Sequence, residues 1–115
     1  VTIVDDINPS EAIIDVTGGT GVLNATVELI DEQSGVDIAN SKYICNTTSE
    51  KLEITNTIWD TADSFSSNPE TLHLRIGEGG EYYLHILIVD NAGNRTECIS
   101  PGVTITPPSV TPDAW

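Results

Sequence analysis

Basic side chains are scarce in this chain of 115 residues: Lys and Arg together number four, against 18 Asp and Glu, so the formal net charge is −14. An acidic surface of this strength repels phosphate groups, which excludes nucleic acid and anionic membranes as natural partners. Two interpretations of the acidic residues stay open. They keep a secreted surface soluble, or some of them collect Ca²⁺, a cation that prefers oxygen ligands.

Long apolar runs are also missing. No stretch approaches the roughly 18 consecutive apolar residues of a membrane-spanning helix, so we expect no membrane insertion. The chain opens Val1-Thr2-Ile3-Val4 and continues with two Asp residues, without the basic start and apolar core of a signal peptide. We therefore expect a mature form or a piece of something longer, with one domain flanked by linkers.

Motifs of catalysis are absent as well. The sequence contains no His-Glu-x-x-His, no P-loop and no Cys-x-x-Cys. Its two histidines, His73 and His85, each lie between apolar residues of a predicted strand, with His85 pointing outward, and neither adjoins a nucleophile elbow. Nucleophilic and metal-dependent hydrolysis both need convergent groups. We expect a protein that is not an enzyme and that requires no cofactor, with Ca²⁺ as the one ion to consider.

Alternation of apolar and polar residues is the main structural signal. In residues 22–30, Leu23 and Val27 fall on one face of a strand, and Asn24 and Glu28 fall on the other. A period of two residues is typical of a half-buried β-strand. Shorter strands are expected around it. Their predicted ranges are 11–17, 42–47, 52–58, 71–76 and 96–106.

Residues 82–90 form a second long predicted strand, in which both faces are largely apolar. This composition favours a central position in its sheet. Tyr83, Leu87 and Val89 make an apolar stripe on the outward face. Either the loop 60–69 or an edge segment covers the stripe, or the stripe is an interface with a partner or a second copy.

Seven short strands separated by Gly- and Asn-rich turns predict an all-β protein, an antiparallel immunoglobulin-like β-sandwich. The sandwich is expected over residues 11–106. Residues 1–10 are predicted to be an N-terminal arm or linker. Residues 107–115 are predicted to be a Pro-rich linker or tail, because proline cannot donate to a β-ladder and favours an extended spacer.

Several short segments give the sequence a family pattern, chiefly an aromatic-led strand that runs into an Asp-x-Ala-Gly-Asn turn. These segments are Asp31, Ser34-Gly35-Val36, Ser41-Lys42-Tyr43, Gly80-Glu81-Tyr82-Tyr83-Leu84 and Asp90-Asn91-Ala92-Gly93-Asn94. They resemble the Ig-like modules that occur in tandem on bacterial surface proteins and in phage structural proteins. The resemblance implies a structural or spacer module at the cell or virion surface, in contact with neighbouring domains or copies of itself.

Two other functions stay open. The chain could be the subunit of an extracellular filament, in which Val1–Val4 or the Pro-rich tail lends a strand to the next copy. It could also be an adhesion module that binds a cell-surface glycan or protein. Such a module needs exposed aromatics, and the chain has only two Trp, three Tyr and one Phe.

Five acidic residues form the candidate Ca²⁺ site: Asp5, Asp6, Asp31, Asp37 and Asp90. In the sandwich that the resemblance implies, their loops share one end of the domain, where one module would meet the previous one. Ca²⁺ would relieve their repulsion and stiffen that joint. The alternative is a set of solvated loop acids, and no EF-hand pattern is present.

Cys45 and Cys98 are the only cysteines. In the implied layout they lie on the two strands that flank residues 82–90, about 10 Å apart. A disulfide needs Cα atoms within about 7 Å, so pairing would require a local distortion. A disulfide and two buried thiols therefore both stay open.

Three N-glycosylation sequons are present, at Asn24, Asn46 and Asn94. Each Asn is expected to point outward, and each is usable if the host glycosylates proteins. Chance produces a similar number in a chain this rich in Ser and Thr.

Overall fold

The computed structural model describes residues 10–30 and 35–107. Its elements, in chain order, are β1 (Ser10–Gly18), β2 (Val22–Ile30), the 3₁₀ helix η1 (Ile38–Asn40), β3 (Lys42–Asn46), the 3₁₀ helix η2 (Thr57–Thr61), β4 (Asp63–Ser64), β5 (Glu70–Arg75), β6 (Gly80–Val89), β7 (Arg95–Ile99) and β8 (Val103–Ile105). The paired strands are antiparallel throughout. The predicted all-β class is confirmed, with eight strands in the described residues in place of seven.

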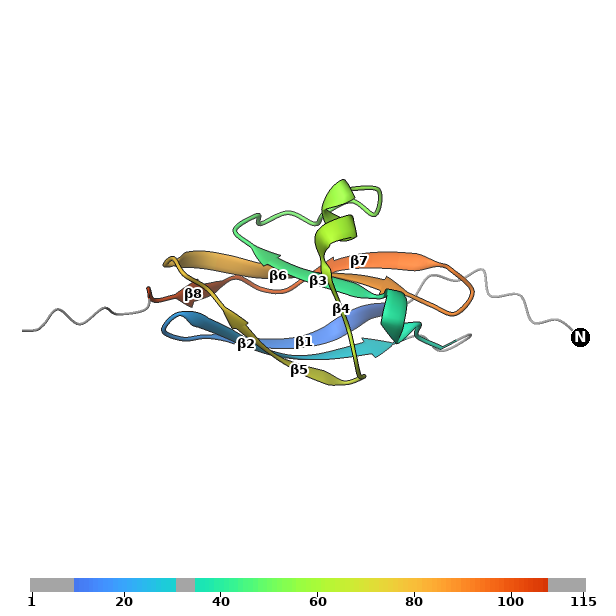
Figure 1. Cartoon of the computed structure of the whole chain (residues 1–115), viewed down its shortest axis with the longest axis horizontal. Helices are drawn as coiled ribbons and strands as arrows, with labels where there is room; N and C mark the ends of the chain where they lie inside the picture. Colours follow the sequence, from blue (N-terminus) through green and yellow to red (C-terminus); the bar gives the residue numbers. More distant parts are fainter. Residues whose placement is uncertain (1–9, 31–34, 108–115) are drawn as a thin grey trace, which may run out of the picture.

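Two sheets stack face to face as a sandwich (Figure 1). The first sheet has the strand order β1-β2-β5, and the second has the order β4-β3-β6-β7, with β8 also paired to β6. The chain crosses between the sheets after β2, β4 and β5. Such crossings between two antiparallel sheets are typical of the immunoglobulin-like sandwich.

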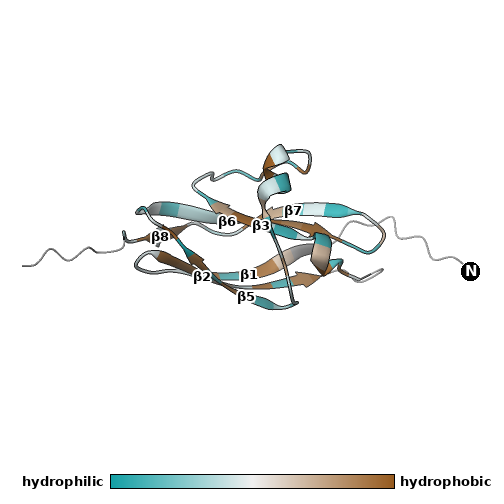
Figure 2. Ribbon diagram, viewed as in Figure 1, coloured by the Kyte–Doolittle hydropathy of each residue, from teal (hydrophilic) through white to brown (hydrophobic). Residues whose placement is uncertain are grey.

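The core lies between the sheets and uses the alternating positions that the sequence predicts. Leu23 and Val27 of β2 and Leu84 and Ile86 of β6 are all at 0% exposure. Figure 2 shows hydrophobic stretches along strands of both sheets. Burying a side chain of this kind contributes roughly 1.5–3 kcal/mol, so these rows hold the two sheets together.

The predicted strand 96–106 is two strands, because Pro101 cannot donate to a ladder and the chain changes partners around it. β7 pairs with the C-terminal half of β6, and β8 pairs with its first three residues. Ser100 fills the gap between them. Its backbone N–H donates to the Leu84 carbonyl, and its hydroxyl accepts from the Leu84 N–H, each at 2.9 Å.

The predicted strand 52–58 is wrong. Leu52, Ile54 and Ile58 are spaced like strand residues, but they belong to an irregular segment that leads into η2. The N-cap of η2 is Asn56, whose side-chain oxygen accepts a hydrogen bond from the Ile58 N–H at 3.0 Å. Capping by Asn competes with strand formation and starts a helical turn here.

Residues 47–62, which we call the cap, lie on the outer face of the second sheet, with η2 standing above β3 and β6 (Figure 1). Leu52 and Trp59 of the cap are buried against Leu87 of β6. The Trp59 indole N–H donates to the Glu53 carbonyl at 2.9 Å. A second, smaller apolar cluster therefore forms outside the sandwich.

The chain enters and leaves the sandwich at opposite ends (Figure 1). At the end that we call proximal, β1 begins at Ser10, paired with Ile30. At the distal end β1 finishes at Gly18, and Thr106, just after β8, bridges to Thr20. The nine residues of β1 span roughly 30 Å between the two ends.

Candidate functional site

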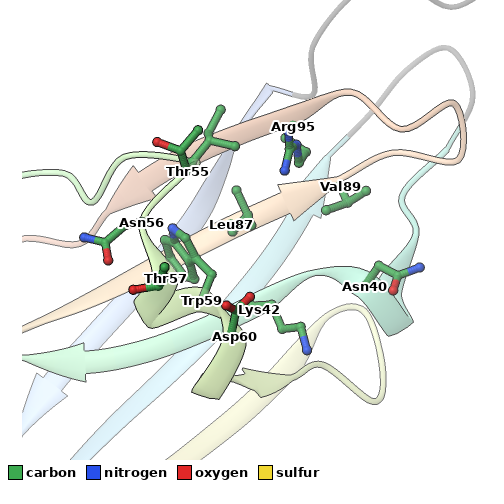
Figure 3. Close-up of a pocket in the computed structure, with 11 residues that line it drawn as sticks. Asn40, Lys42, Thr55, Asn56, Thr57, Trp59, Asp60, Leu87, Val89 and Arg95 are labelled. Carbon is green, nitrogen blue, oxygen red and sulfur yellow. The ribbon is translucent and has the colours of Figure 1, made fainter.

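A groove of about 540 Å³ lies on the outer face of the second sheet, beside the cap (Figure 3). Leu87 and Val89 of β6 form its floor, and Trp59 of the cap lies on one side of them. Two cations, Lys42 of β3 and Arg95 of β7, lie on opposite sides of β6. The other lining residues are Asn40, Ile54, Thr55, Asn56, Thr57 and Asp60.

Strand register brings the two cations to the same face. Lys42 is paired with Leu87, and Arg95 is paired with Val89. Paired residues project from the same side of a sheet, and residues two apart on β6 do so as well. The strands that flank β6 are about 10 Å apart. The two cations therefore border the groove from opposite sides of β6, with Lys42 beside Asp60 (Figure 3).

The electrostatics of the groove differ from those of the chain as a whole. Lys42 and Arg95 are two of only four Lys and Arg residues, against 18 acids. Neither side chain forms an ion pair or hydrogen bond with another residue in the part of the chain that the structure describes. Asp60 lines the groove together with the two cations, and the register of β7 places Glu97 on the same face as Arg95, so acids of the chain lie near both cations. The lining contains no His or Cys.

His85 lies on the outer face of β6, as predicted, but it is not exposed: its exposed fraction is 0%. Its Nε2 lies 2.7 Å from Asn46 Oδ1 and 3.0 Å from the Thr48 carbonyl. Both partners are acceptors, so Nε2 carries the proton, and the buried Nδ1 has no hydrogen-bond partner. Burial lowers the pKa of His85 because it disfavours the imidazolium, and the Thr48 carbonyl opposes this only in part.

The apolar stripe on β6 is covered mainly by residues that precede the predicted loop 60–69, and Ala62 of that loop packs against the same cluster. The cap covers it, and the exposed fraction of Leu87 is only 5%. Tyr83 and Val89 are half-buried. The stripe as a whole is thus not a free interface, and its Leu87 and Val89 line the groove.

The candidate Ca²⁺ site lies only partly within the described residues. Asp5, Asp6 and Asp31 lie outside them. Asp37 and Asp90 do lie together: the Asp37 N–H donates to the Val89 carbonyl at 2.7 Å, and Val36 bridges to Asp90. Within residues 10–30 and 35–107, no group of three or more His, Cys, Asp or Glu side chains gathers where it could hold a metal ion. Calcium binding stays a prediction.

Asp90 also has a structural task in the turn between β6 and β7. Its exposed fraction is 1%. Its Oδ1 accepts from the N–H groups of Ala92 and Asn94, at 3.0 Å and 2.8 Å. Gly93 has a φ of +93°, a conformation that glycine adopts without strain. The carboxylate of Asp90 thus orders this turn.

Cys45 and Cys98 are thiols in the structure, on the two strands that flank β6, as the implied layout has them. Cys45 pairs with Leu84, and Cys98 pairs with Ile86. Two strand spacings, about 10 Å, separate them. Burial raises the pKa of the Cys45 thiol to about 11, so little of the nucleophilic thiolate forms at neutral pH.

The three sequon asparagines all have protein contacts. Asn24 lies on the outer face of the first sheet, where its Oδ1 contacts Nδ1 of His73. Asn46 holds the buried histidine of β6. The Asn94 side-chain amide donates to Asp90 Oδ2 at 3.0 Å. Glycosylation at these positions stays a prediction.

Sequence reasoning missed the groove. Lys42 and Arg95 lie 53 positions apart in the printed chain, and only the register of β3 and β7 against β6 places them together. Trp59 lies just after the predicted strand 52–58, and sequence reasoning assigned it no part in a site. The signal in the sequence is the scarcity of Lys and Arg, which makes the position of each one informative.

Comparison with family models, curated proteins and solved structures gives no match. No helix among the described residues has the length and apolar character needed to cross a membrane. The functional argument therefore rests on the geometry.

Proposed function

We propose that the chain is a non-catalytic spacer module of an extracellular bacterial or phage surface protein. The observation that carries the proposal is the position of the chain ends, which lie at opposite ends of the sandwich (Figure 1). A module of this form joins its neighbours in line, so each copy adds its own length to a stalk. The sequence resemblance to tandem Ig-like modules supports the same function.

The distal end of the sandwich supports this function because the departing chain is tied to the body. The Gly21 N–H donates to the Thr106 carbonyl at 2.7 Å, and the Thr106 N–H donates to the Gly19 carbonyl at 3.1 Å. These bonds attach the chain to the turn between β1 and β2. Tension along a stalk would therefore reach the first sheet directly.

The side chains most suited to catalysis are occupied in the described structure. His85 is buried against Asn46, and His73 contacts Asn24. The thiol of Cys45 has a raised pKa. These contacts support a structural function over an enzymatic one.

A filament subunit is the second candidate, favoured by a hollow of about 300 Å³ between the edge strands β3 and β5. Tyr43, Cys45, Leu74 and Ile76 line it. β4 pairs with only the first two residues of β3, so the rest of that edge is open to an added strand. The adhesion alternative has less support, since Phe65 and Trp59 are buried and the tyrosines are half-buried.

Analytical ultracentrifugation of the purified chain over a wide concentration range separates the two candidates. A spacer module sediments as a monomer throughout. A strand-exchanging subunit forms polymers that persist on dilution, and Leu74→Lys in the hollow would dissolve them. Persistent polymers that Leu74→Lys dissolves would overturn the spacer proposal.

A further inference from the structure

His85 lies between β6 and the cap, and its imidazole is at 0% exposure. Its Nε2 meets Asn46 Oδ1 and the Thr48 carbonyl, where the chain enters the cap. Its Nδ1 is buried, with no hydrogen-bond partner among the described residues. We propose that protonation of His85 releases the cap, which closes over β6 while the imidazole is neutral and lifts away when the imidazole takes up a proton from solvent. This inference goes beyond the spacer function and does not depend on it.

The hydrogen bonds around His85 determine where the added proton would go. The Thr48 N–H donates to Asn46 Oδ1 at 2.9 Å, so the carboxamide of Asn46 turns its oxygen, an acceptor, toward the imidazole. The Thr48 carbonyl is an acceptor as well. Nε2 therefore carries the proton of the neutral ring, and acid must add its proton at Nδ1. In the closed form that N–H would be buried without an acceptor, in a ring that has also become charged.

The neighbours of His85 within the sheet give an imidazolium little compensation. Ile44 of β3 and Ile99 of β7 are its direct cross-strand partners, and both are apolar. Lys42 and Glu97 flank the next outward position of β6, one on each side, and their charges have opposite signs. The sheet therefore offers no single carboxylate that pairs with the protonated ring.

The other titratable groups on this side of the sheet are equally unhelpful. Those of β6, β7 and the cap are Glu50, Lys51, Glu53, Asp60, Glu81, Tyr83 and Arg95. Tyr83 stays neutral, because its hydrogen bond to Glu81 raises the pKa of its hydroxyl. The others are exposed, so water and salt screen their charges. Burial therefore dominates, and the pKa of His85 is lowered.

The cap is the part of this environment that can move away. β6 is paired on both sides, with β3 and with β7, so the sheet holds His85 in place. The backbone hydrogen bonds that order the cap are local: the Asn56 N–H donates to the Glu53 carbonyl at 2.9 Å, and the Trp59 N–H donates to the Asn56 carbonyl at 3.2 Å. Apolar packing around Leu87 holds the cap on the sheet, and the contacts of His85 add to it. Opening would hydrate the imidazolium and uncover Leu87, which is at 5% exposure in the closed form.

Amide hydrogen exchange of the full ¹⁵N-labelled chain, followed by NMR from about pH 7.5 to about pH 5.5, tests the proposal. The ordinary pKa of histidine, 6.5, lies inside this range, and the pKa of His85 in the closed form lies lower. The open form therefore takes up the proton first as the pH falls, so the opening equilibrium should rise by up to about tenfold. A 3₁₀ helix of five residues does not persist off the sheet, so the amides of η2 exchange when the cap opens.

The protection factors of the Trp59 and Ala62 amides, which both bond within the cap, should fall by that factor on acidification. They should also stay below the protection factor of the Leu84 amide, which bonds to Ser100 in the buried core, because the cap opens without global unfolding. Equal protection in the cap and the core would overturn the proposal, and so would protection of the cap that does not change with pH.

Two variants assign the opening to the proton on His85. His85→Gln cannot gain a charge, so the protection of its cap should not depend on pH. Asn46→Asp places a carboxylate beside Nε2, which favours the imidazolium in the closed form, so protection should no longer fall on acidification. His73→Gln, in the exposed histidine of β5, is the matched control and should keep the wild-type fall. A fall of wild-type size in the His85→Gln or the Asn46→Asp chain would overturn the proposal. None of these results bears on the in-line geometry of the sandwich.

Discussion

His85 and Asn46 face each other across β6 and β3, with Nε2 of the imidazole 2.7 Å from the carboxamide Oδ1. This contact lies where the chain leaves β3 and enters the cap. The imidazole also meets the Thr48 carbonyl, so one neutral histidine holds the first residues of the cap against the sheet. The polar contacts of His85 thus hold the start of the cap, and the packing of Trp59 holds a later part of it.

The stability of the domain should fall as the pH drops below 6.5, because the buried His85 resists protonation. Its folded-state pKa lies below the ordinary value of 6.5. The unfolded chain therefore takes up the proton first, and stability is complete above pH 6.5 and declines between the two pKa values. Urea unfolding from about pH 7.5 to about pH 5.5, above the range where most carboxylates titrate, measures the decline.

Two variants assign this pH dependence to one residue. His85→Gln should give a flat stability profile over the same range. His73→Gln, in the exposed histidine of β5, should keep the slope of the wild-type protein. A wild-type profile without a slope, or a slope that survives His85→Gln, would show that the buried histidine does not act in this way.

Trp59→Ala should lower the free energy of unfolding by about 3 kcal/mol, because it empties the centre of the cap cluster. Trp59→Phe keeps a ring but loses the hydrogen bond to the Glu53 carbonyl, and should cost about 1 kcal/mol. Ile13→Thr, at a side chain that is 58% exposed, should stay within about 0.5 kcal/mol of wild type. Equal stabilities for all three chains in urea unfolding would mean that the cap does not pack on the sheet.

Gly18→Ala should weaken the distal end, where β1 and β8 approach closely. A Cβ at Gly18 would lie 2.2 Å from the Thr104 carbonyl oxygen, so the two strands must separate. We expect a loss of about 1–3 kcal/mol in urea unfolding. Gly77→Ala is the matched control, since a Cβ there meets nothing within 4 Å. If the two variants are equally stable, the close approach of β1 and β8 is not present in solution.

Thiol titration of the unfolded, unreduced protein should count two thiols. Cys45 and Cys98 face the core on opposite sides of β6, too far apart for a disulfide. In the folded protein Cys45 should react slowly at neutral pH, because the pKa of its thiol is raised to about 11. A count of zero, with a mass lower by two hydrogens, would require a shift of β3 against β7.

Much of the sandwich could be predicted because its strands are regular. Residues 22–30 were predicted as a strand and are β2 in the structure, and the predicted strand 82–90 matches β6 to within two residues at its start. Period-two alternation specifies which side chains face the core, whatever the partner strands are. The prediction of a strand over residues 52–58 was wrong. The same spacing of apolar residues also occurs in an irregular segment, whose side chains pack on the sheet while its backbone pairs with no strand.

The groove could not be predicted from the sequence because it depends on tertiary placement. Lys42 and Arg95 line one groove only because of the register of three strands. The cap places Trp59 beside them by a non-local contact with Leu87. The apolar outward face of β6 does indicate that something covers it, but the sequence leaves open which segment does so, and the burial of His85 under the cap could not be predicted.

The most direct test of the account is small-angle X-ray scattering from two copies of the chain joined head to tail. Opposite chain ends predict that the second copy extends the maximum dimension by at least roughly 30 Å, the length of β1. The pair-distance distribution should show two separated lobes. A compact particle, whose maximum dimension barely exceeds that of one copy, would contradict the in-line spacer.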